Sequence, residues 1–318
     1  MFRKKSLLFA ASIILAGVPV GCATATVRDT TLINKATLFM PGDIEPQSPY
    51  SASPALAPGS NKVFVTQSES NGRYRIMQSV FRAGKWSVLS TASFSGVYRD
   101  LESAYSPGGK YLIFASNRPA KVRDSVLDGH YNGIVTKGGG GNLWKVSFSK
   151  KSDLVPKRLP AVINSGDAVF SPAVTARGVL YFMRADSGGK FHIYRSALLN
   201  RVYQTPVKAS FSLGQYGDYD PAVAPDESFL IFSSSRPPSS KTSDLFIVFR
   251  IRSGWTDPVD LRQYLGDAVH GIEARLSPDL TELYYSNSQN AAGVDDPAKQ
   301  FIWKVKIAPL LKHTLSNN

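Results

Sequence analysis

Cysteine is almost absent from this chain of 318 residues, which contains Cys22 and no other. A single cysteine excludes an internal disulfide, so strand pairing and packing must hold the fold together. It also leaves no thiol nucleophile in the domain that follows residue 22. The chain has no Gly-x-Ser-x-Gly nucleophile elbow. Its histidines show no paired metal-ligand spacing; they are His130, His192, His270 and His313.

Helical periodicity is also lacking, except in an apolar segment at the N-terminus. The basic residues Arg3, Lys4 and Lys5 precede an apolar run over residues 6–20. This run is too short to be assigned as a membrane span and has the shape of an export signal. We therefore expect an export signal over residues 1–22, a short linker over 23–35, and export of the mature domain to a bacterial periplasm or its membranes.

Cys22 lies at the end of that apolar run. This placement resembles a bacterial lipoprotein signal, in which the cysteine is acylated and becomes the mature N-terminus. It predicts a protein on a periplasm-facing outer membrane, held by a lipid anchor at Cys22. The alternative is cleavage after Ala23-Thr24-Ala25, an Ala-x-Ala site, which gives a soluble periplasmic protein. Both alternatives predict an exported protein.

Basic residues are in excess, but they are not clustered. The formal net charge is +13, and it falls to +10 when Arg3, Lys4 and Lys5 are removed. No run of five or more Lys or Arg marks a binding patch, and nucleic acid is not expected as the partner of an exported chain. We interpret the excess as a solvated basic surface, with attraction to anionic lipid or acidic polysaccharide as the functional alternative.

A repeated unit of proline, short turn and apolar strand is the main positive signal. The prolines are Pro58, Pro107, Pro172, Pro225 and Pro278, at intervals of 49, 65, 53 and 53 residues. In the fourth copy the strand-like segments are 220–223, 229–233, 244–250 and 259–261. Four short strands per unit, repeated, are typical of the blades of a β-propeller.

The sequence therefore predicts an all-β fold, a single β-propeller of four-stranded blades over residues 36–311, followed by a polar tail over 312–318. Five blades is the direct count, and six is the alternative if the 65-residue interval hides a degenerate unit. The last unit lacks its fourth strand, and a lone strand near residues 36–40 precedes the first unit. We expect that strand to complete the last blade and close the ring.

Two copies of the repeat carry a family resemblance. Ser106-Pro107-Gly108-Gly109-Lys110, an apolar run and then Ser116-Asn117-Arg118 resemble the repeat of TolB-type, WD-like propellers, and Ser235-Arg236 matches it again. The resemblance covers residues 36–307 and implies a periplasmic propeller that acts as a protein-interaction scaffold, without implying any reaction. TolB itself has an extra N-terminal domain, for which residues 25–35 leave no room, so we expect the propeller alone.

Acidic residues recur at one position of the repeat. The residues five positions before the prolines are Ser53, Glu102, Asp167, Asp220 and Glu273. We expect the four carboxylates to converge near one mouth of the central channel, because the innermost strand lines it. Three interpretations stay open: architectural acids that bond backbone N–H groups or pair with Arg118 or Arg236, a ring that binds a cation, and acid/base carboxylates. No other cofactor is expected.

The segment from residue 120 to 141 is the least repeat-like part of the chain. Loops of this length are usually functional or disordered. We predict a partner-binding loop with His130 and Tyr131 as its anchors, and a flexible turn over the glycines 138–141. His270 is of interest because it precedes Glu273 near the expected channel mouth.

These observations favour a monomeric, non-enzymatic propeller of the cell envelope that binds a protein or polysaccharide. The predicted binding residues are His130, Tyr131, His270, Arg118 and Arg236. The alternative is a periplasmic carbohydrate-active enzyme, a glycosidase or lyase, that uses channel-mouth carboxylates. Its predicted catalytic residues are Glu102, Asp167, Asp220 and Glu273.

Overall fold

The computed structural model describes most of the predicted propeller, as one compact unit that begins at Ile33. The described residues are 36–39, 48–59, 61–69, 72–121, 123–149, 154–239, 243–265, 269–290, 292–307 and 311. The predicted export signal, the linker, Cys22 and the polar tail lie outside them. Within the described residues, no helix has the length and apolarity needed to cross a membrane.

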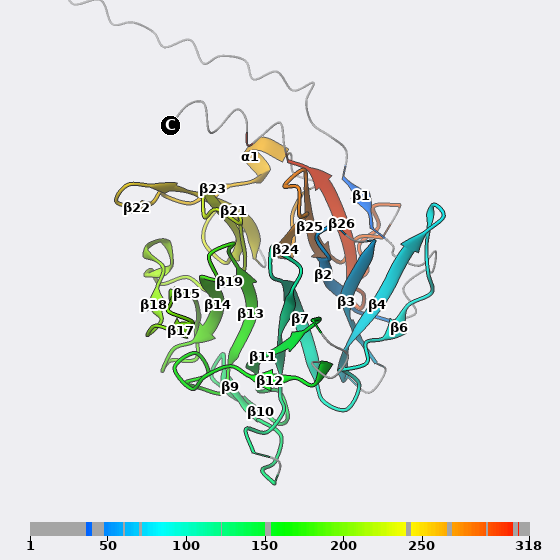
Figure 1. The fold of residues 1–318 in the computed structure, drawn as a ribbon. Coiled ribbons are helices and arrows are strands. Elements are labelled where there is room, and N and C mark those ends of the chain that lie inside the picture. Colours follow the sequence, from blue (N-terminus) through cyan, green and yellow to red (C-terminus); the bar gives the residue numbers. More distant parts are fainter. Residues whose placement is uncertain are drawn as a thin grey trace, which may run out of the picture. The chain divides into compact units, whose positions relative to one another are not determined.

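Five antiparallel sheets follow one another in chain order, which confirms the five-bladed propeller (Figure 1). Blade 1 contains β2 (Ser51–Leu56), β3 (Lys62–Ser68), β4 (Tyr74–Arg82), β5 (Lys85–Trp86) and β6 (Ser90–Thr91). Blade 2 contains β7 (Asp100–Tyr105), β8 (Tyr111–Ser116), β11 (Asn142–Ser147) and β12 (Lys157–Arg158). Blade 3 contains β13 (Val169–Val174), β14 (Leu180–Ala185), β15 (Phe191–Ser196) and β18 (Val207–Lys208).

Blades 4 and 5 repeat the same order. Blade 4 contains β19 (Asp218–Val223), β20 (Phe229–Ser234), β21 (Asp244–Ile251), β22 (Gly254–Trp255) and β23 (Val259–Asp260). Blade 5 contains β24 (Ile272–Leu276), β25 (Glu282–Asn287) and β26 (Phe301–Lys306), with β1 (Thr37–Leu38) as its outer strand. The first strand of each blade contacts the first strands of both neighbouring blades, so these five strands line the central channel.

The ring closes through the predicted N-terminal strand. Strand β1 pairs antiparallel with β26, with Thr37 opposite Lys304 and Leu38 opposite Trp303. Phe39 follows the strand and packs edge-on against Tyr284, with ring centroids 4.9 Å apart. Strand pairing and aromatic packing thus join the two ends of the propeller without a disulfide.

The core lies between blades, because the second strand of each blade is covered on both faces. Strand β20 is buried along its whole length, which explains its continuous apolar sequence. The buried apolar residues form five clusters, each between two neighbouring blades. Since a fully buried Phe or Leu contributes about 1.5–3 kcal/mol, these clusters account for much of the cohesion between blades.

The long interval in the second unit is a single insertion, as predicted. Strands β9 (Gly129–Tyr131) and β10 (Ile134–Thr136) form a hairpin between β8 and β11. A smaller ribbon in blade 3 joins β16 (Leu198–Leu199) to β17 (Val202–Tyr203). The described helical turns are η3 (Ser210–Ser212) and α1 (Arg262–Leu265).

The third copy of the repeat is shifted relative to the alignment on its proline. Pro172 lies inside β13, whereas the turn that follows this strand begins at Thr175. The structural counterpart of the turn prolines is Ala176, four residues further along the chain. The repeat accepts proline at two places, in the innermost strand and in the turn after it, and the third copy keeps the first. Alignment on Pro172 therefore selected the wrong acid in this blade.

Candidate functional site

Each innermost strand has a break in its pairing near its start, typical of a β-bulge. One residue at each break has a positive φ; these residues are Ser53 (50°), Glu102 (52°), Ser171 (47°), Asp220 (52°) and Glu273 (60°). Left-handed backbone costs a non-glycine residue on the order of 1 kcal/mol, so neighbouring contacts must stabilise it. We call these five positions the bulge layer.

Two serines and three acids therefore form this layer. Asp167 was wrongly predicted to belong to this layer, because Ser171 occupies the equivalent position in blade 3. The Asp167 side chain is 35% exposed, and its carboxylate contacts Nδ1 of His130 in the insertion hairpin. Glu102, Asp220 and Glu273 do hold equivalent positions, and each is about 5% exposed.

The three acids hydrogen-bond from one blade to the next. Glu273 of blade 5 accepts hydrogen bonds from the Tyr50 hydroxyl and from the Ser53 hydroxyl, the latter at 2.9 Å.

Glu102 of blade 2 accepts a bond of 2.7 Å from the backbone N–H of Ser171 in blade 3. Asp220 of blade 4 accepts a bond of 3.3 Å from the backbone N–H of Glu273. These contacts are those of acids that fix neighbouring bulges relative to one another.

Burial dominates the electrostatics of the bulge layer. Desolvation, followed by the nearby Asp220 and Glu273, raises the pKa of Glu102 to about 8. Desolvation and then Asp220 raise the pKa of Glu273 to about 7, although the bond from Tyr50 acts in the opposite direction. Desolvation also raises the pKa of Asp220, against the opposing effect of Arg275. Protonated carboxyls near neutral pH are chemically suited to proton transfer as well as to structural hydrogen bonding.

Arg275 was missed by the sequence analysis. It lies two residues after Glu273 and is 6% exposed. Its Nη2 donates to the hydroxyls of Ser53 in blade 1, at 3.4 Å, and Ser171 in blade 3, at 3.2 Å. The signal is present in the repeat: the residues two positions after the bulge layer are Ala55, Ala104, Ala173, Ala222 and Arg275. One arginine among four alanines marks a side chain that crosses the channel.

The described residues provide no ligand set for a metal ion. Among the described residues, no three His, Cys, Asp or Glu side chains are grouped so that they could hold a metal ion. The acids of the bulge layer instead use their oxygens for hydrogen bonds between blades.

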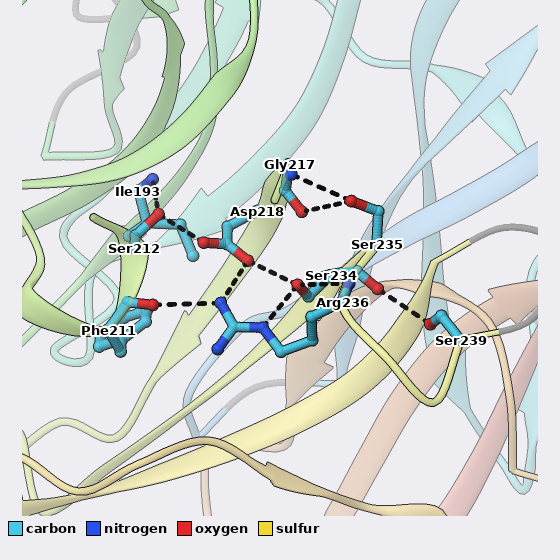
Figure 2. A network of polar contacts seen from close by, with 9 residues as sticks. All are labelled: Ile193, Phe211, Ser212, Gly217, Asp218, Ser234, Ser235, Arg236 and Ser239. Atoms are coloured by element: carbon cyan, nitrogen blue, oxygen red, sulfur yellow. Dashed lines mark hydrogen bonds and ion pairs between the residues drawn. The ribbon is translucent and has the colours of Figure 1, made fainter. Parts of the chain in front are cut away.

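Arg118 and Arg236 pair with Asp100 and Asp218, and no described hydrogen bond joins them to the bulge-layer acids. Arg236 Nη2 is 2.7 Å from Asp218 Oδ1 and donates to the carbonyl of Phe211 (Figure 2). Ser212 joins this cluster by donating to the same carboxylate and accepting from the N–H of Ile193 in blade 3. Figure 2 thus shows a chain of polar contacts that runs from blade 3 into blade 4.

Blade 2 repeats this cluster. Arg118 Nη2 is 3.0 Å from Asp100 Oδ2 and donates to the carbonyl of Phe94. Ser95 takes the place of Ser212, because it donates to Asp100 and accepts from the N–H of Ile76 in blade 1. The Ser-x-Arg element of the repeat is therefore used to join blades.

The insertion hairpin borders a pocket of about 490 Å³. His130 and Tyr131 line it from β9, Asp167 from the segment before β13, and Arg184 and Asp186 from the end of β14. The backbone N–H of Asn132 donates to the carbonyl of Gly189 at 2.8 Å and fixes the hairpin to the β14–β15 turn. The two anchors predicted from the sequence thus line one pocket, with charged groups of blade 3 opposite them.

The glycines at 139–141 are packed closely against the hairpin and its neighbours, whereas Gly138 has a positive φ of 62°. A Cβ atom on Gly140 would lie 2.6 Å from the carbonyl oxygen of Asp128, and one on Gly141 would lie 2.1 Å from the ring of Phe170. Real Cβ atoms do not approach so closely, so glycine is required there by close approach of neighbouring atoms. The turn over these glycines was predicted to be flexible, whereas the structure shows it closely packed.

His270 is half-buried and lies three residues before Glu273. Its backbone carbonyl accepts a hydrogen bond of 3.2 Å from the side chain of Asn287. His192 is buried and contacts the carboxylate of Asp186 at 3.1 Å, which places it at the β14–β15 turn.

No protein-family model matches this sequence. No curated protein matches it either. Its fold is similar to that of TolB from Acinetobacter baumannii, with 17% identity, a TM-score of 0.47 and coverage of 80% of this chain and 54% of that one. This chain therefore spans about half the length of that TolB.

Two similar structures are glycoside hydrolases. A thermostable family-43 glycoside hydrolase has 12% identity and a TM-score of 0.54, covering 85% of this chain and 92% of that one. The catalytic domain of the Coprinopsis cinerea GH62 α-L-arabinofuranosidase has 13% identity and a TM-score of 0.51, covering 86% and 96%. At these identities the likeness establishes the fold, a five-bladed β-propeller, and nothing further.

Proposed function

We propose that this chain is an exported, TolB-type propeller of the cell envelope that binds a protein partner through its β9–β10 hairpin. The observation that carries the proposal is the surface of this hairpin. Ile134 and Val135 are 62% and 56% exposed, next to each other on β10. Strand β10 pairs with β9 and with no second strand among those described. Exposed apolar residues on an unpaired strand edge are a common protein-docking surface.

The surroundings of the hairpin support the same function. The pocket beside it combines the apolar side of Tyr131 with charged groups, among them Asp167, Arg184 and Asp186. The bond to Gly189 and the packed glycines below the hairpin restrain its conformation. A preformed docking element loses little conformational entropy on binding. The N-terminal sequence, read as an export signal, directs the proposal to an envelope partner.

Site-specific cross-linking tests this proposal. A photo-reactive phenylalanine analogue in place of Ile134 is expected to give a discrete cross-linked protein in cell envelopes. The same analogue in place of Val88, which is 69% exposed on blade 1, is the matched control and is expected to give none. Ile134→Ser combined with Val135→Ser should lower partner recovery at least tenfold without changing the unfolding midpoint, because both side chains are exposed.

Two results would contradict the proposal. One is equal cross-linking from positions 134 and 88. The other is retention of the unmodified chain by an envelope polysaccharide, with that retention lost in the double serine variant and no protein cross-link formed. The second result would assign the hairpin to glycan binding.

A carbohydrate-active enzyme is the second candidate. The observation that favours it is the raised pKa of Glu102, about 8, and of Glu273, about 7, because a general acid must hold its proton near neutral pH. Against it, both side chains are almost fully buried and their oxygens accept hydrogen bonds from neighbouring blades.

Glycan turnover tests the enzyme candidate. If it holds, Glu273→Gln lowers turnover of an active glycan at least a hundredfold while the far-UV spectrum and unfolding midpoint stay close to those of the unmodified chain. Glu227→Gln is the matched control, since Glu227 lies on the turn after β19 and pairs there with Arg195 of β15. If no glycan is turned over, or if Glu273→Gln acts only by lowering stability, the acids are architectural.

A further inference from the structure

The channel mouth on the turn side of the bulge layer is a pocket of about 290 Å³. All five blades contribute to its wall, through Leu56, Tyr105, Val174, Val223 and Leu276. Prolines of the turns and of the innermost strands complete it. Apolar residues thus surround the mouth, as in most small-molecule sites.

Arg275 is the one charged side chain among the described residues that line this pocket. Its guanidinium bonds three neutral oxygens: Nη1 donates to the carbonyl of Ala274, and Nη2 donates to the hydroxyls of Ser53 and Ser171. Its Nε is buried and has no hydrogen-bond partner among the described residues. No carboxylate of the described residues forms a salt bridge with it, although it is 6% exposed.

A buried cation without an ion partner is costly, and an unused buried donor adds to that cost. The charged groups that face Arg275 from the strands around it are Glu102 on β7, Asp220 on β19 and Glu273 on β24. Blades 1 and 3 contribute serines instead. The pKa of Glu102 is about 8 and that of Glu273 about 7, so both are largely protonated at about pH 6. Protonation of these two acids reduces the negative charge that faces Arg275.

We propose that this mouth binds a small monocarboxylate with an apolar body, with the carboxylate on Arg275 and the body against the proline-lined wall. A guanidinium matches a carboxylate in geometry and charge. One buried cation suits one negative charge, whereas a phosphate would bring more charge and no apolar surface. The volume is close to the lower limit of about 300 Å³ for ligand pockets, which favours a small ligand.

Calorimetric titration of the full chain at about pH 6 with octanoate tests the proposal. Octanoate is expected to bind saturably, and 1-octanol, which lacks the carboxylate, to bind at least tenfold more weakly. Arg275→Met should weaken octanoate binding at least tenfold. Because that variant can lose stability, Ala104→Phe serves as a second test. Ala104 lines the pocket, and the larger side chain reduces its volume while Arg275 keeps its charge. Arg177→Met, on the exposed turn after β13, is the control and should leave affinity within twofold.

A second arm identifies the source of the carboxylate. A five-residue peptide ending in leucine with a free carboxylate is compared with its amidated form. Binding of the free peptide but not of octanoate assigns the mouth to a protein C-terminus, whose carboxylate would bind Arg275 in the same way. The proposal is overturned if neither carboxylate binds at millimolar concentration, if 1-octanol binds as well as octanoate, or if Ala104→Phe leaves binding unchanged.

Discussion

Tyr50 donates its hydroxyl hydrogen bond to Glu273 across the junction where blade 1 meets blade 5. The same tyrosine packs edge-on against Tyr74, with centroids 5.0 Å apart, so its position is fixed on two sides. The ring is therefore closed at two levels: by the pairing of β1 with β26 at the outer edge, and by this bond in the channel.

Tyr50→Phe tests the inner closure. The substitution keeps the ring packing and removes the donor from a buried carboxyl, so we expect a loss of about 1–3 kcal/mol in the free energy of unfolding. Urea unfolding at fixed pH measures it. Tyr216→Phe is the control, because the Tyr216 side chain is half-buried and forms no described hydrogen bond. A loss below about 0.5 kcal/mol for Tyr50→Phe would show that the bond contributes little to closure.

The bulge-layer acids predict that stability falls as pH rises from about 5 to 8. Both Glu102 and Glu273 have a folded pKa above the ordinary value of 4.5, at about 8 and about 7. Between the ordinary and the raised pKa the folded state holds more protons than the unfolded state, so raising the pH favours unfolding. Each acid contributes at most about 1.4 kcal/mol per pH unit in that window.

Urea midpoints measured from about pH 5 to 8 check this slope, which Glu102→Gln should reduce. Glu227→Gln is the control, since the bonds from Arg195 and Tyr181 outweigh desolvation and lower the pKa of Glu227. Its contribution is present above the ordinary carboxyl pKa, so removing it leaves the slope above pH 5 unchanged. Stability that stays constant or rises over this range would refute the prediction.

The sequence predicted the fold well because turn chemistry and strand burial repeat in every blade. It predicted the bulge layer less well, because a bulge adds a residue that no turn or apolar run marks. Proline at both Pro54 and Pro58 shows that the repeat has two places for it, and Pro172 alone could not indicate which one was kept. Asp167 was selected over Ser171 for this reason. Arg275 was not predicted because the sequence analysis compared the repeats only at the position of the acids, two residues earlier.

The buried pair of Arg236 and Asp218 should be costly to break. Arg236→Met leaves Asp218, which is 1% exposed, without its cation, and removal of one partner from such a pair costs about 3–5 kcal/mol. Combining it with Asp218→Asn should cost less than the sum of the two single changes, which a double-mutant cycle by urea unfolding measures. Lys299→Met is the control, because the Lys299–Asp296 pair has side chains 52% and 37% exposed and should contribute less than about 1 kcal/mol. Additive single effects would mean that the pair acts through packing alone.

Gly141 tests whether the hairpin depends on close packing beneath it. A Cβ atom at this position would lie 2.1 Å from the Phe170 ring, and the backbone on either side bonds across to blade 3. The ring cannot move freely, because it also contacts Phe191 and Tyr131. Gly141→Ala should therefore destabilise the protein by about 1–3 kcal/mol, by displacing Phe170 from the base of the hairpin.

Gly166→Ala is the control: its added Cβ atom meets no atom within 4 Å, so its stability should lie within about 0.5 kcal/mol of that of the unmodified chain. Hydrogen exchange adds a local measurement: in Gly141→Ala the amide of Asn132, which bonds to Gly189, should exchange faster. Equal exchange at Asn132 in both variants would show that the hairpin is held independently of the packing around Phe170.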